Sequence, residues 1–282
     1  MPITPKELIA NLGDLPPLPQ VAAQVLRIAA DPDSSTDDLQ RVIATDQALT
    51  AQILKIANSA MFGMMREVRT LTQAIMTLGF NTIKSVVIAS SAKNLYSRGT
   101  AGLQERLMWE HALYAALAAR AYARQLRHPR AEEAFLGALM HDIGKSVLGL
   151  KYPERYSQLI RSVYNGQGDG LELEFELFGF DHAMVGEALL LSWNLAHALE
   201  QAVRWHHDPS QAEPDHQALV ALVAMGNQLA LDRGIGIGKP ETLDRTTATA
   251  RVLLGLDTAA LAEHQEAVLQ MIELDKSLLT EF

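Results

Sequence analysis

Helical signals recur along almost the whole chain and constrain its fold more than any other feature. Thr4, Pro5 and Glu7 combine an N-cap, a proline suited to the first helical turn and the acid of a capping box. Farther along, apolar residues recur at the three- and four-residue spacing of helices buried on one face. The β-branched run 86–88 is the best candidate for a strand, but the Ala and Ser residues around it favour a buried helix. The chain is therefore predicted to be all-α.

A change in composition divides the predicted helices into two lobes. The stretch 96–104 contains several Gly, Ser and Thr residues, as linkers do. We expect an N-terminal helical lobe over residues 1–100 and a second helical lobe, with a C-terminal helical extension, over residues 101–282. The second lobe begins with two Ala- and Leu-rich stretches, each predicted to be helical, at about residues 105–126 and 131–149.

Composition and charge exclude several classes of function. The net charge of −9 opposes sequence-independent binding to nucleic acid, which depends on Lys and Arg residues that neutralise phosphates. The chain has no cysteine, which excludes disulfides, zinc–thiolate sites and thiol nucleophiles. No run of about 18 apolar residues is visible, so no membrane-spanning helix is expected. We expect a cytoplasmic protein that binds neither nucleic acid nor a membrane.

One short motif carries residues suited to metal and phosphate chemistry. His141 and Asp142 are neighbours within the second Ala- and Leu-rich stretch. Adjacent helical residues diverge by only about 100°, so their side chains can converge on a single ion between them. Lys145 lies one helical turn beyond His141, where its ammonium group could meet a phosphate. His111 lies on the preceding predicted helix, and antiparallel packing of the two helices could place it beside this pair.

Three further histidines lie downstream. His182 stands at the start of a predicted helical stretch, and the pair His206 and His207 stands at its end. Imidazole and carboxylate ligands without thiolates suit Fe, Mn, Zn or Ni better than Cu(I), Ca or Mg. The ordinary alternative is that these are polar residues of a core or of helix ends. The candidate ligands for one or two divalent ions are His111, His141, Asp142, His182, His206 and His207.

The order of these residues resembles that of the HD superfamily, especially the HD-GYP cyclic-dinucleotide phosphodiesterases. In that superfamily the matching positions hold one to three metal ions that activate water against a phosphoester. This chain departs from the pattern in two places. Asn227 stands where the superfamily has its last metal-binding aspartate, and residues 208–210 lack the Gly-Tyr-Pro segment of the HD-GYP type. Because asparagine is a neutral and weak ligand, the resemblance implies an under-charged site.

Four segments of the N-terminal half match a more specific pattern in order and approximate spacing. These segments are residues 15–19, 46–50, 54–60 and 74–79. Together with the histidine motifs they resemble the HDOD family, over about residues 12–231. Gln47 stands where that family usually has proline, which is a minor departure. The resemblance implies a multi-helical HDOD fold in which the second lobe is HD-like. HDOD proteins are mostly regarded as regulators without enzyme activity.

The resemblance implies a bacterial signal-transduction protein that acts through regulatory protein partners and uses the HD-derived site as a metal or ligand pocket. A nucleotide or another phosphate is the expected ligand, with Lys145 as its contact. The alternative is a metal-dependent phosphohydrolase that acts on a nucleotide or a cyclic dinucleotide. The missing carboxylate and the missing Gly-Tyr-Pro segment speak against it. A third hypothesis is a helical scaffold that binds no ion.

The remaining histidines and one glycine-rich segment are predicted to lie outside any site. His128 and His216 stand in segments that contain proline, and His264 stands in a charged segment. His197 is a helical residue for which the sequence suggests no partner. Residues 234–239 lack the glycine and the Ser or Thr that a P-loop requires at its two ends, so they are predicted to form a turn.

Overall fold

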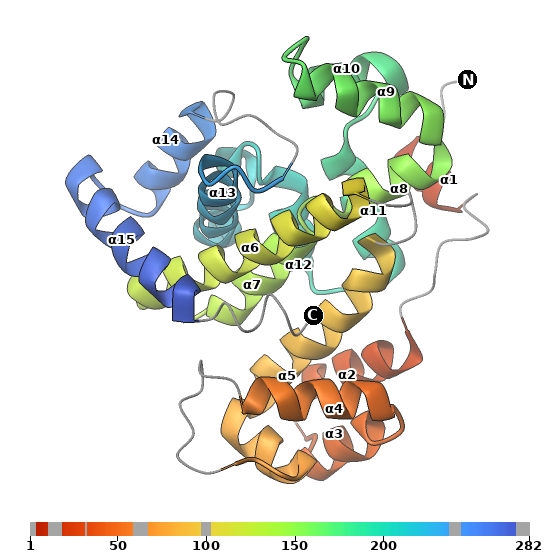
Figure 1. The fold of residues 1–282 in the computed structure, drawn as a ribbon, viewed down its shortest axis with the longest axis vertical. Coiled ribbons are helices and arrows are strands. Elements are labelled where there is room, and N and C mark those ends of the chain that lie inside the picture. The colour runs from red at the N-terminus through yellow and green to blue at the C-terminus, as the bar shows by residue number, and fades with distance from the viewer. Residues whose placement is uncertain are drawn as a thin grey trace. The chain divides into compact units, whose positions relative to one another are not determined.

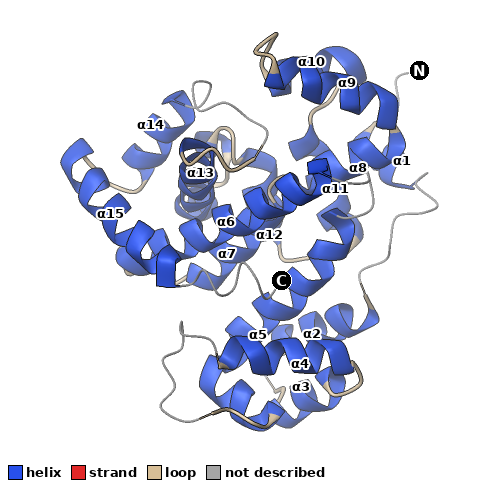
Figure 2. Cartoon of the chain, in the orientation of Figure 1, coloured by secondary structure: helices blue, strands red, loops and turns tan. Residues whose placement is uncertain are grey.

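The architecture is all-helical. In this computed structural model the described residues form helices joined by loops, and no strand occurs among them (Figure 2). Residues 86–88 lie within a helix, so the predicted fold class and the preference for helix over strand at this run are both confirmed. The structure describes residues 4–10, 19–31, 33–58, 67–96, 103–236 and 244–274.

The contacts between helices divide the chain into two compact units. The larger unit comprises Met1–Leu15 and Leu95–Leu269, and the smaller unit comprises Pro16–Asn94 and Gln270–Phe282. The predicted boundary at about residue 100 lies close to the boundary between Asn94 and Leu95 that separates the two units. The two divisions differ in the unit to which they assign each end of the chain. The division into those two lobes stays a prediction.

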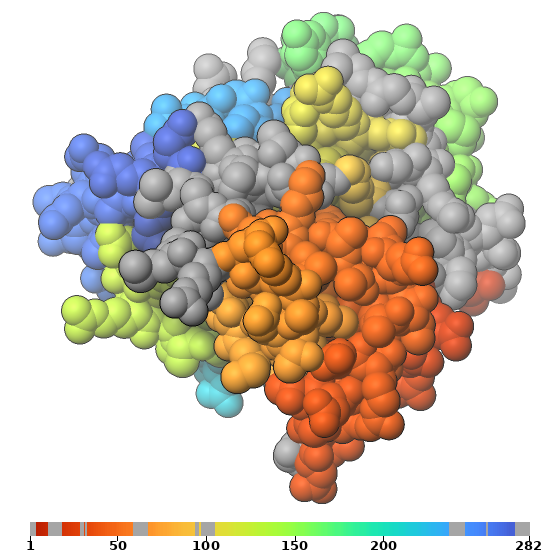
Figure 3. Space-filling view, turned by 60° about the horizontal axis from the view of Figure 1, so that its bottom comes forward, coloured from red at the N-terminus to blue at the C-terminus, as the bar shows by residue number. Residues whose placement is uncertain are grey.

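Helix caps and a small apolar core shape the smaller unit. It contains α2 (Gln20–Ala30), α3 (Thr36–Ile43), α4 (Gln47–Ala57) and most of α5 (Leu71–Tyr96). Ser35 and Asp38 form a reciprocal capping box at the start of α3, and the Asp46 side chain caps α4. Ile53 and Ile83 are fully buried in its core. In the space-filling view the red-to-orange side chains of this unit form one continuous surface (Figure 3).

Two residues of the smaller unit have clear structural roles. The Asn58 side chain holds the backbone of Val68, because its Nδ2 donates to the carbonyl oxygen and its Oδ1 accepts from the amide, both at 2.7 Å. Gly79 interrupts α5 with a φ of 78°, which glycine adopts without steric cost. Among the described residues, the segment Leu71–Lys93 of α5 is long and apolar enough to span a membrane; 61% of it is buried, as in an ordinary core helix.

The larger unit is built around three helices that pack closely on one another, α6, α7 and α13 (Figure 1). Gly226 allows α13 to approach α6, since a Cβ atom there would lie 2.4 Å from the carbonyl oxygen of Ala115. Helix α1 packs on α11 within the same unit. The helices are α1 (Pro5–Ala10), α6 (Leu103–Gln125), α7 (Ala131–Met140), α8 (Ile143–Lys151), α9 (Pro153–Tyr164), α10 (Gly170–Phe178), α11 (His182–Ser192), α12 (His197–Trp205), α13 (Gln217–Asp232), α14 (Asp244–Leu253) and α15 (Thr258–Leu274).

The helix predicted over residues 131–149 is divided in the structure, which corrects the prediction. Helix α7 ends before His141, and α8 begins after Asp142. Asp142 leaves the helical conformation, with φ of −99° and ψ of 7°. The apolar pattern continues across the break because the turn is itself buried. His141 and Asp142 therefore project from a turn between two helices rather than from one continuous helix.

The stretch from His182 to the histidine pair is also two helices rather than one. Helix α11 ends at Ser192, and α12 begins at His197. Between them Asn194 adopts a φ of 52°, a left-handed conformation that asparagine tolerates better than most residues. As a result, His182 begins one helix and the histidine pair follows the end of the next.

Candidate metal centre

Several separate elements bring the six predicted ligands together in the larger unit. The approach of α8 to α11 depends on Gly144, where a Cβ atom would lie 1.9 Å from the carbonyl oxygen of His182. We call the six residues the buried centre, since all except His207 are buried. Its members are His111 in α6, His141 and Asp142 between α7 and α8, His182 at the start of α11, and His206 and His207 just after α12.

One half of the buried centre consists of His111, His141 and Asp142. The Nε2 atoms of the two histidines lie 3.3 Å apart. Asp142 Oδ2 lies 3.4 Å from His141 Nε2 and 3.7 Å from His111 Nε2. One ligand atom from each residue thus lies within 4.8 Å of the others, a spacing that can hold a metal ion. This juxtaposition confirms the expectation that His111 lies beside the His141–Asp142 pair.

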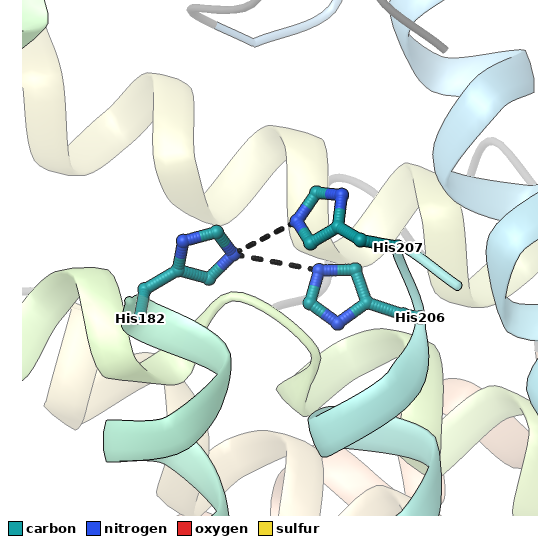
Figure 4. Close-up of side chains that lie close together, drawn as sticks. All are labelled: His182, His206 and His207. Carbon is teal, nitrogen blue, oxygen red and sulfur yellow. Dashed lines mark hydrogen bonds between the residues drawn. The ribbon is translucent and has the colours of Figure 1, made fainter. Parts of the chain in front are cut away.

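The other half consists of His182, His206 and His207, whose rings converge from the ends of α11 and α12 (Figure 4). His182 Nε2 lies 3.1 Å from His207 Nε2 and 3.4 Å from His206 Nε2. These three ligand atoms also lie within 4.8 Å of one another. The arrangement offers three nitrogen ligands to a second ion.

Asp142 links the two halves. Its Oδ2 faces His111 and His141, while its Oδ1 lies 3.1 Å from His182 Nε2 and 3.9 Å from His206 Nε2. Oδ1 is buried, and the donor that can reach it is His182 Nε2, which donates only when that nitrogen carries a proton. A buried carboxylate oxygen without a donor is costly unless a cation faces it. The two oxygens of Asp142 could therefore each serve as a ligand, one toward each half of the buried centre.

Acceptors on the outer side orient four of the five imidazoles. Carbonyl and carboxylate oxygens only accept hydrogen bonds, so each neutral ring carries its hydrogen on Nδ1 and a lone pair on Nε2. The lone pairs of these four rings consequently point into the buried centre. The Nδ1 atoms lie 2.8 Å from Ile235 O for His111, 2.6 Å from Ala138 O for His141, 2.8 Å from Val203 O for His206 and 2.7 Å from Glu174 Oε2 for His182.

Burial and neighbouring charges set the protonation of the rings. Burial lowers the pKa of His111 to about 4. Burial, together with the neighbouring histidines, also holds the pKa values of His206 and His207 well below the usual range. Burial alone would lower the pKa of His182, but the Glu174 carboxylate and its hydrogen bonds outweigh it and raise the pKa to about 9. A proton therefore competes with a metal ion for His182 Nε2.

Lys145 lies beside the buried centre and makes an ion pair with it. Its Nζ lies 2.8 Å from Asp142 Oδ2, and its side chain is 30% exposed. Burial alone would raise the pKa of the Asp142 carboxyl, but His141 and Lys145 outweigh it and hold that pKa well below its usual range. Asp142 is thus ionised at neutral pH, and Lys145 adds a positive charge next to it.

Glu174 also belongs to the site, although the sequence pattern does not identify it. It is buried in α10, and its Oε2 accepts from both the backbone amide and Nδ1 of His182, each at 2.7 Å. Its Oε1 accepts from the Tyr156 hydroxyl at 3.2 Å. A carboxylate behind a metal-binding histidine fixes the ring and makes its other nitrogen more basic. Glu174 therefore positions His182.

A cavity opens beside the buried centre. Its volume is about 400 Å³, which is within the size range of small-molecule sites. Asn227, predicted to replace an aspartate ligand, is buried and lines this cavity. Lys145 also lines it, so an anion in the cavity could reach both the lysine and the buried centre. The lining residues of the centre itself are His111, Asp142, His182 and His207.

A second group of possible ligands lies on the surface of the larger unit. His197, Glu213 and His216 also offer ligand atoms within 4.8 Å of one another. The sequence suggests no partner for His197, but its Nδ1 and Nε2 lie 3.0 Å from carboxylate oxygens of Glu200 and Glu213. We call His197, Glu213 and His216 the surface group. His197 and its partner Glu213 lie in separate segments of the chain, which the sequence pattern does not connect.

The described part of the glycine-rich segment also contributes to the site. The carbonyl oxygen of Ile235 accepts from His111 Nδ1, so this segment orients a ring rather than cradling a phosphate. Residues 237–239 of the predicted turn lie outside the described residues.

Known proteins share the sequence pattern and the fold of this chain. Residues 15–209 match the profile of the HDOD domain, which covers more than half of the chain. The chain belongs to the HDOD family. An HDOD domain protein of unknown function from Geobacter sulfurreducens shares the fold with 23% identity and a TM-score of 0.82, over 97% of this chain and 96% of that one.

Two further relatives widen the comparison for this HDOD protein. A Shewanella amazonensis protein, named as a proposed phosphohydrolase, is 28% identical and covers 96% of this chain and 97% of its own, with a TM-score of 0.74. A Treponema pallidum protein is 24% identical over 218 residues, or 77% of this chain. The chain spans 42% of the length of that curated relative.

Proposed function

We propose that this HDOD protein is a cytoplasmic signalling regulator whose buried centre binds one or two divalent ions and senses a phosphate-containing ligand. The expected ions are Fe, Mn, Zn or Ni, which match a set of imidazoles with one carboxylate. Binding of the ligand is passed on to regulatory protein partners. The family resemblance supports the regulatory role, and the geometry of the buried centre supports the ions.

The facing imidazole nitrogens are the observation that carries the proposal. The outer acceptors direct the Nε2 lone pairs of His111 and His141 toward each other at 3.3 Å. Two lone pairs at this distance repel unless a proton or a cation lies between them. Two nitrogens bound to one ion at about 2.0–2.1 Å would themselves lie about 3.0–3.4 Å apart. The spacing in both halves of the buried centre fits that range.

Different residues of the site have different roles in binding an ion and a phosphate. A divalent ion in such a centre polarises a phosphoryl oxygen and makes nearby water more acidic. Asp142 holds both halves together, and Glu174 keeps His182 in the required orientation. Lys145 offers an ammonium group to a phosphate in the cavity, although it must share that charge with Asp142. These groups suffice to bind a phosphate.

Asn227 is the reason to propose sensing rather than catalysis. It lines the cavity at a position where the HD superfamily has an aspartate, and an amide cannot replace the charge of a carboxylate. A missing anionic ligand weakens retention of an ion and removes a group that could orient an attacking water. Loss of positioning alone can slow a reaction by a factor of about 100. We therefore expect phosphate binding with very little turnover.

The test measures phosphate binding and turnover on the same samples. The full chain, purified with Mn or Fe supplied, is titrated with inorganic phosphate in a calorimeter and assayed with bis-p-nitrophenyl phosphate. We expect phosphate binding that depends on the metal, together with negligible turnover. Asp142→Ala should abolish this binding, whereas His264→Ala, outside the buried centre, should leave it unchanged. Binding that needs no metal, or no binding at all, would contradict the proposed sensor.

A metal-dependent phosphohydrolase acting on a nucleotide or cyclic dinucleotide is the second candidate. The observation that favours it is the cavity, which is lined by members of both halves of the buried centre. In this case the wild type would turn over a phosphoester at a substantial metal-dependent rate. Asn227→Asp gives the matched comparison, since it restores the carboxylate of the superfamily. Robust turnover by the wild type would replace the sensor with the enzyme, while turnover only in Asn227→Asp would support the sensor.

A further inference from the structure

The cavity beside the buried centre has one polar end and an apolar wall. The polar part of the lining includes four members of the buried centre, together with Lys145 and Asn227. Among the described residues, aliphatic side chains from α9 and α10 line the rest of the cavity together with Met108 of α6 and Leu231 of α13, and Gly166, Gly168 and Gly170 also line it. A ligand that fills the cavity must therefore be amphipathic, with an anionic group and an apolar group.

Three aliphatic residues of the wall are only half-buried. They are Ile160 and Val163 on α9 and Leu171 at the start of α10. Apolar surface that a ligand covers is removed from water, which favours binding in proportion to the covered area. Covering these half-buried aliphatic side chains with an apolar ligand group should therefore make the free energy of binding more favourable.

The polar side chains near this wall already have partners within the protein. The Tyr156 hydroxyl donates to Glu174, and the Thr246 hydroxyl donates to the carbonyl oxygen of His207. Asp169 Oδ1 accepts from two backbone amides at the start of α10. Because these groups are already engaged, the hydrogen-bonding edges of a ligand would find fewer open partners along this wall than in water.

We propose that the cavity binds a phosphate monoester whose organic group is apolar. The phosphate lies at the buried centre and Lys145, and the organic group packs on Ile160, Val163 and Leu171. This proposal rests on the proposed function, because the phosphate end requires ions in the buried centre. It goes further by assigning the class of organic group, which neither the family nor the relatives specify.

A nucleotide meets the same site less well. Its phosphate can occupy the polar end, but the polar edges of its base then face an aliphatic wall. An unpaired polar edge loses its water without gaining a hydrogen bond. An alkyl phosphate has no such edge, so it should bind more tightly than a mononucleotide that carries the same phosphate group.

The experiment compares three phosphate monoesters on the full chain with Mn supplied. Methyl phosphate, hexyl phosphate and adenosine monophosphate are titrated by calorimetry. Hexyl and methyl phosphate share the same charged group and differ by five methylenes. Each buried methylene favours binding by a factor of about 4, so hexyl phosphate should bind at least about ten times more tightly than methyl phosphate. The nucleotide should bind more weakly than hexyl phosphate.

A matched pair of variants locates the organic group. Val163→Thr places a hydroxyl on the wall with little change in volume, and Val252→Thr makes the same change on an exposed residue of α14. In Val163→Thr the advantage of hexyl over methyl phosphate should fall several-fold, while methyl phosphate binds as before. Val252→Thr should change neither affinity. Thermal unfolding confirms that both variants are folded, and Leu171→Ser provides a second test of the wall.

The outcomes separate this proposal from the proposed function. If methyl phosphate binds in a metal-dependent way but hexyl phosphate binds no more tightly, the apolar group is wrong and the sensor stands. If adenosine monophosphate binds more tightly than hexyl phosphate, a nucleotide replaces the apolar ester. If none of the three binds in the presence of metal, both the proposed function and this proposal are overturned.

Discussion

The buried centre and the surface group contain the same kinds of residue at similar distances, yet their chemistry differs. The half of the buried centre formed by His111, His141 and Asp142, like the surface group, presents ligand atoms of two histidines and one carboxylate within 4.8 Å of one another. The His111 side chain is 6% exposed, whereas the His197 side chain is 54% exposed. Four rings of the buried centre have an acceptor behind Nδ1 and direct Nε2 into the centre. The surface group lacks this arrangement.

Three ring nitrogens of the surface group have partners without a metal ion. His197 lies between the carboxylates of Glu200 and Glu213, and these hydrogen bonds raise its pKa above the usual value. His216 Nδ1 lies 3.2 Å from an Arg130 nitrogen that can only donate, so that ring nitrogen is already an acceptor. The difference teaches that proximity alone does not define a metal site. The direction of the lone pairs and the burial of the charged groups are also needed to define one.

Removal of metal should give the largest difference between the two groups. A ligand at about 100 times its dissociation constant stabilises the folded state by about 2.7 kcal/mol. For a chain of this size that corresponds to a fall in Tm of roughly 5–10 °C when a chelator removes the ion. The fall should be seen in the wild type and in His197→Ala but not in His182→Ala. Equal falls in the two variants would remove the distinction between the groups.

Removal of the orienting carboxylate should have an intermediate effect. Glu174→Gln keeps the size of the side chain but loses the charge that holds His182. Such a change behind a metal-binding histidine lowers metal affinity by about 10- to 100-fold, and competition with a fluorescent chelator measures this. Glu200→Gln makes the matched change behind His197 and should leave metal affinity unaltered. A Glu174→Gln protein with wild-type affinity would show that its carboxylate has no positioning role.

The surface group should contribute a small, pH-dependent stability. Because the pKa of His197 is raised in the folded protein, its contribution is present at low pH and lost as the pH rises through that folded pKa. His197→Ala should therefore lower the free energy of unfolding more at pH 6 than at pH 9. The loss at pH 6 should stay below about 1 kcal/mol, since the side chains of His197 and Glu213 are both exposed to solvent. Urea unfolding at the two pH values checks this, and a larger loss at pH 9 would contradict it.

The fold class and the grouping of the six candidate ligands could be predicted from the sequence because residue type and order carry them. Helical spacing and caps indicate an all-α chain without reference to tertiary contacts. His141 and Asp142 form a recognisable motif, and the other histidines occur in the order of the HD superfamily. The break at this motif could not be predicted, because a buried turn preserves the apolar pattern of the helices around it.

The residues that orient the rings could not be predicted, for a physical reason. Glu172, Glu174 and Glu176 alternate along α10, and only packing buries Glu174 behind His182. Three other rings are oriented by backbone carbonyl groups, and every residue has one. The partner of His197 likewise depends on how α12 meets the segment that holds Glu213. Such contacts depend on tertiary structure rather than on local sequence.

The metal content of three purified proteins tests the central claim most directly. These are the wild type, the double variant His141→Ala/His206→Ala of the buried centre and the double variant His197→Ala/His216→Ala of the surface group. After supplementation and removal of loosely bound metal, elemental analysis should find one or two equivalents of a divalent ion in the wild type and in the surface variant. The buried-centre variant should retain almost none. A wild type without metal, or loss of metal only in the surface variant, would contradict the account.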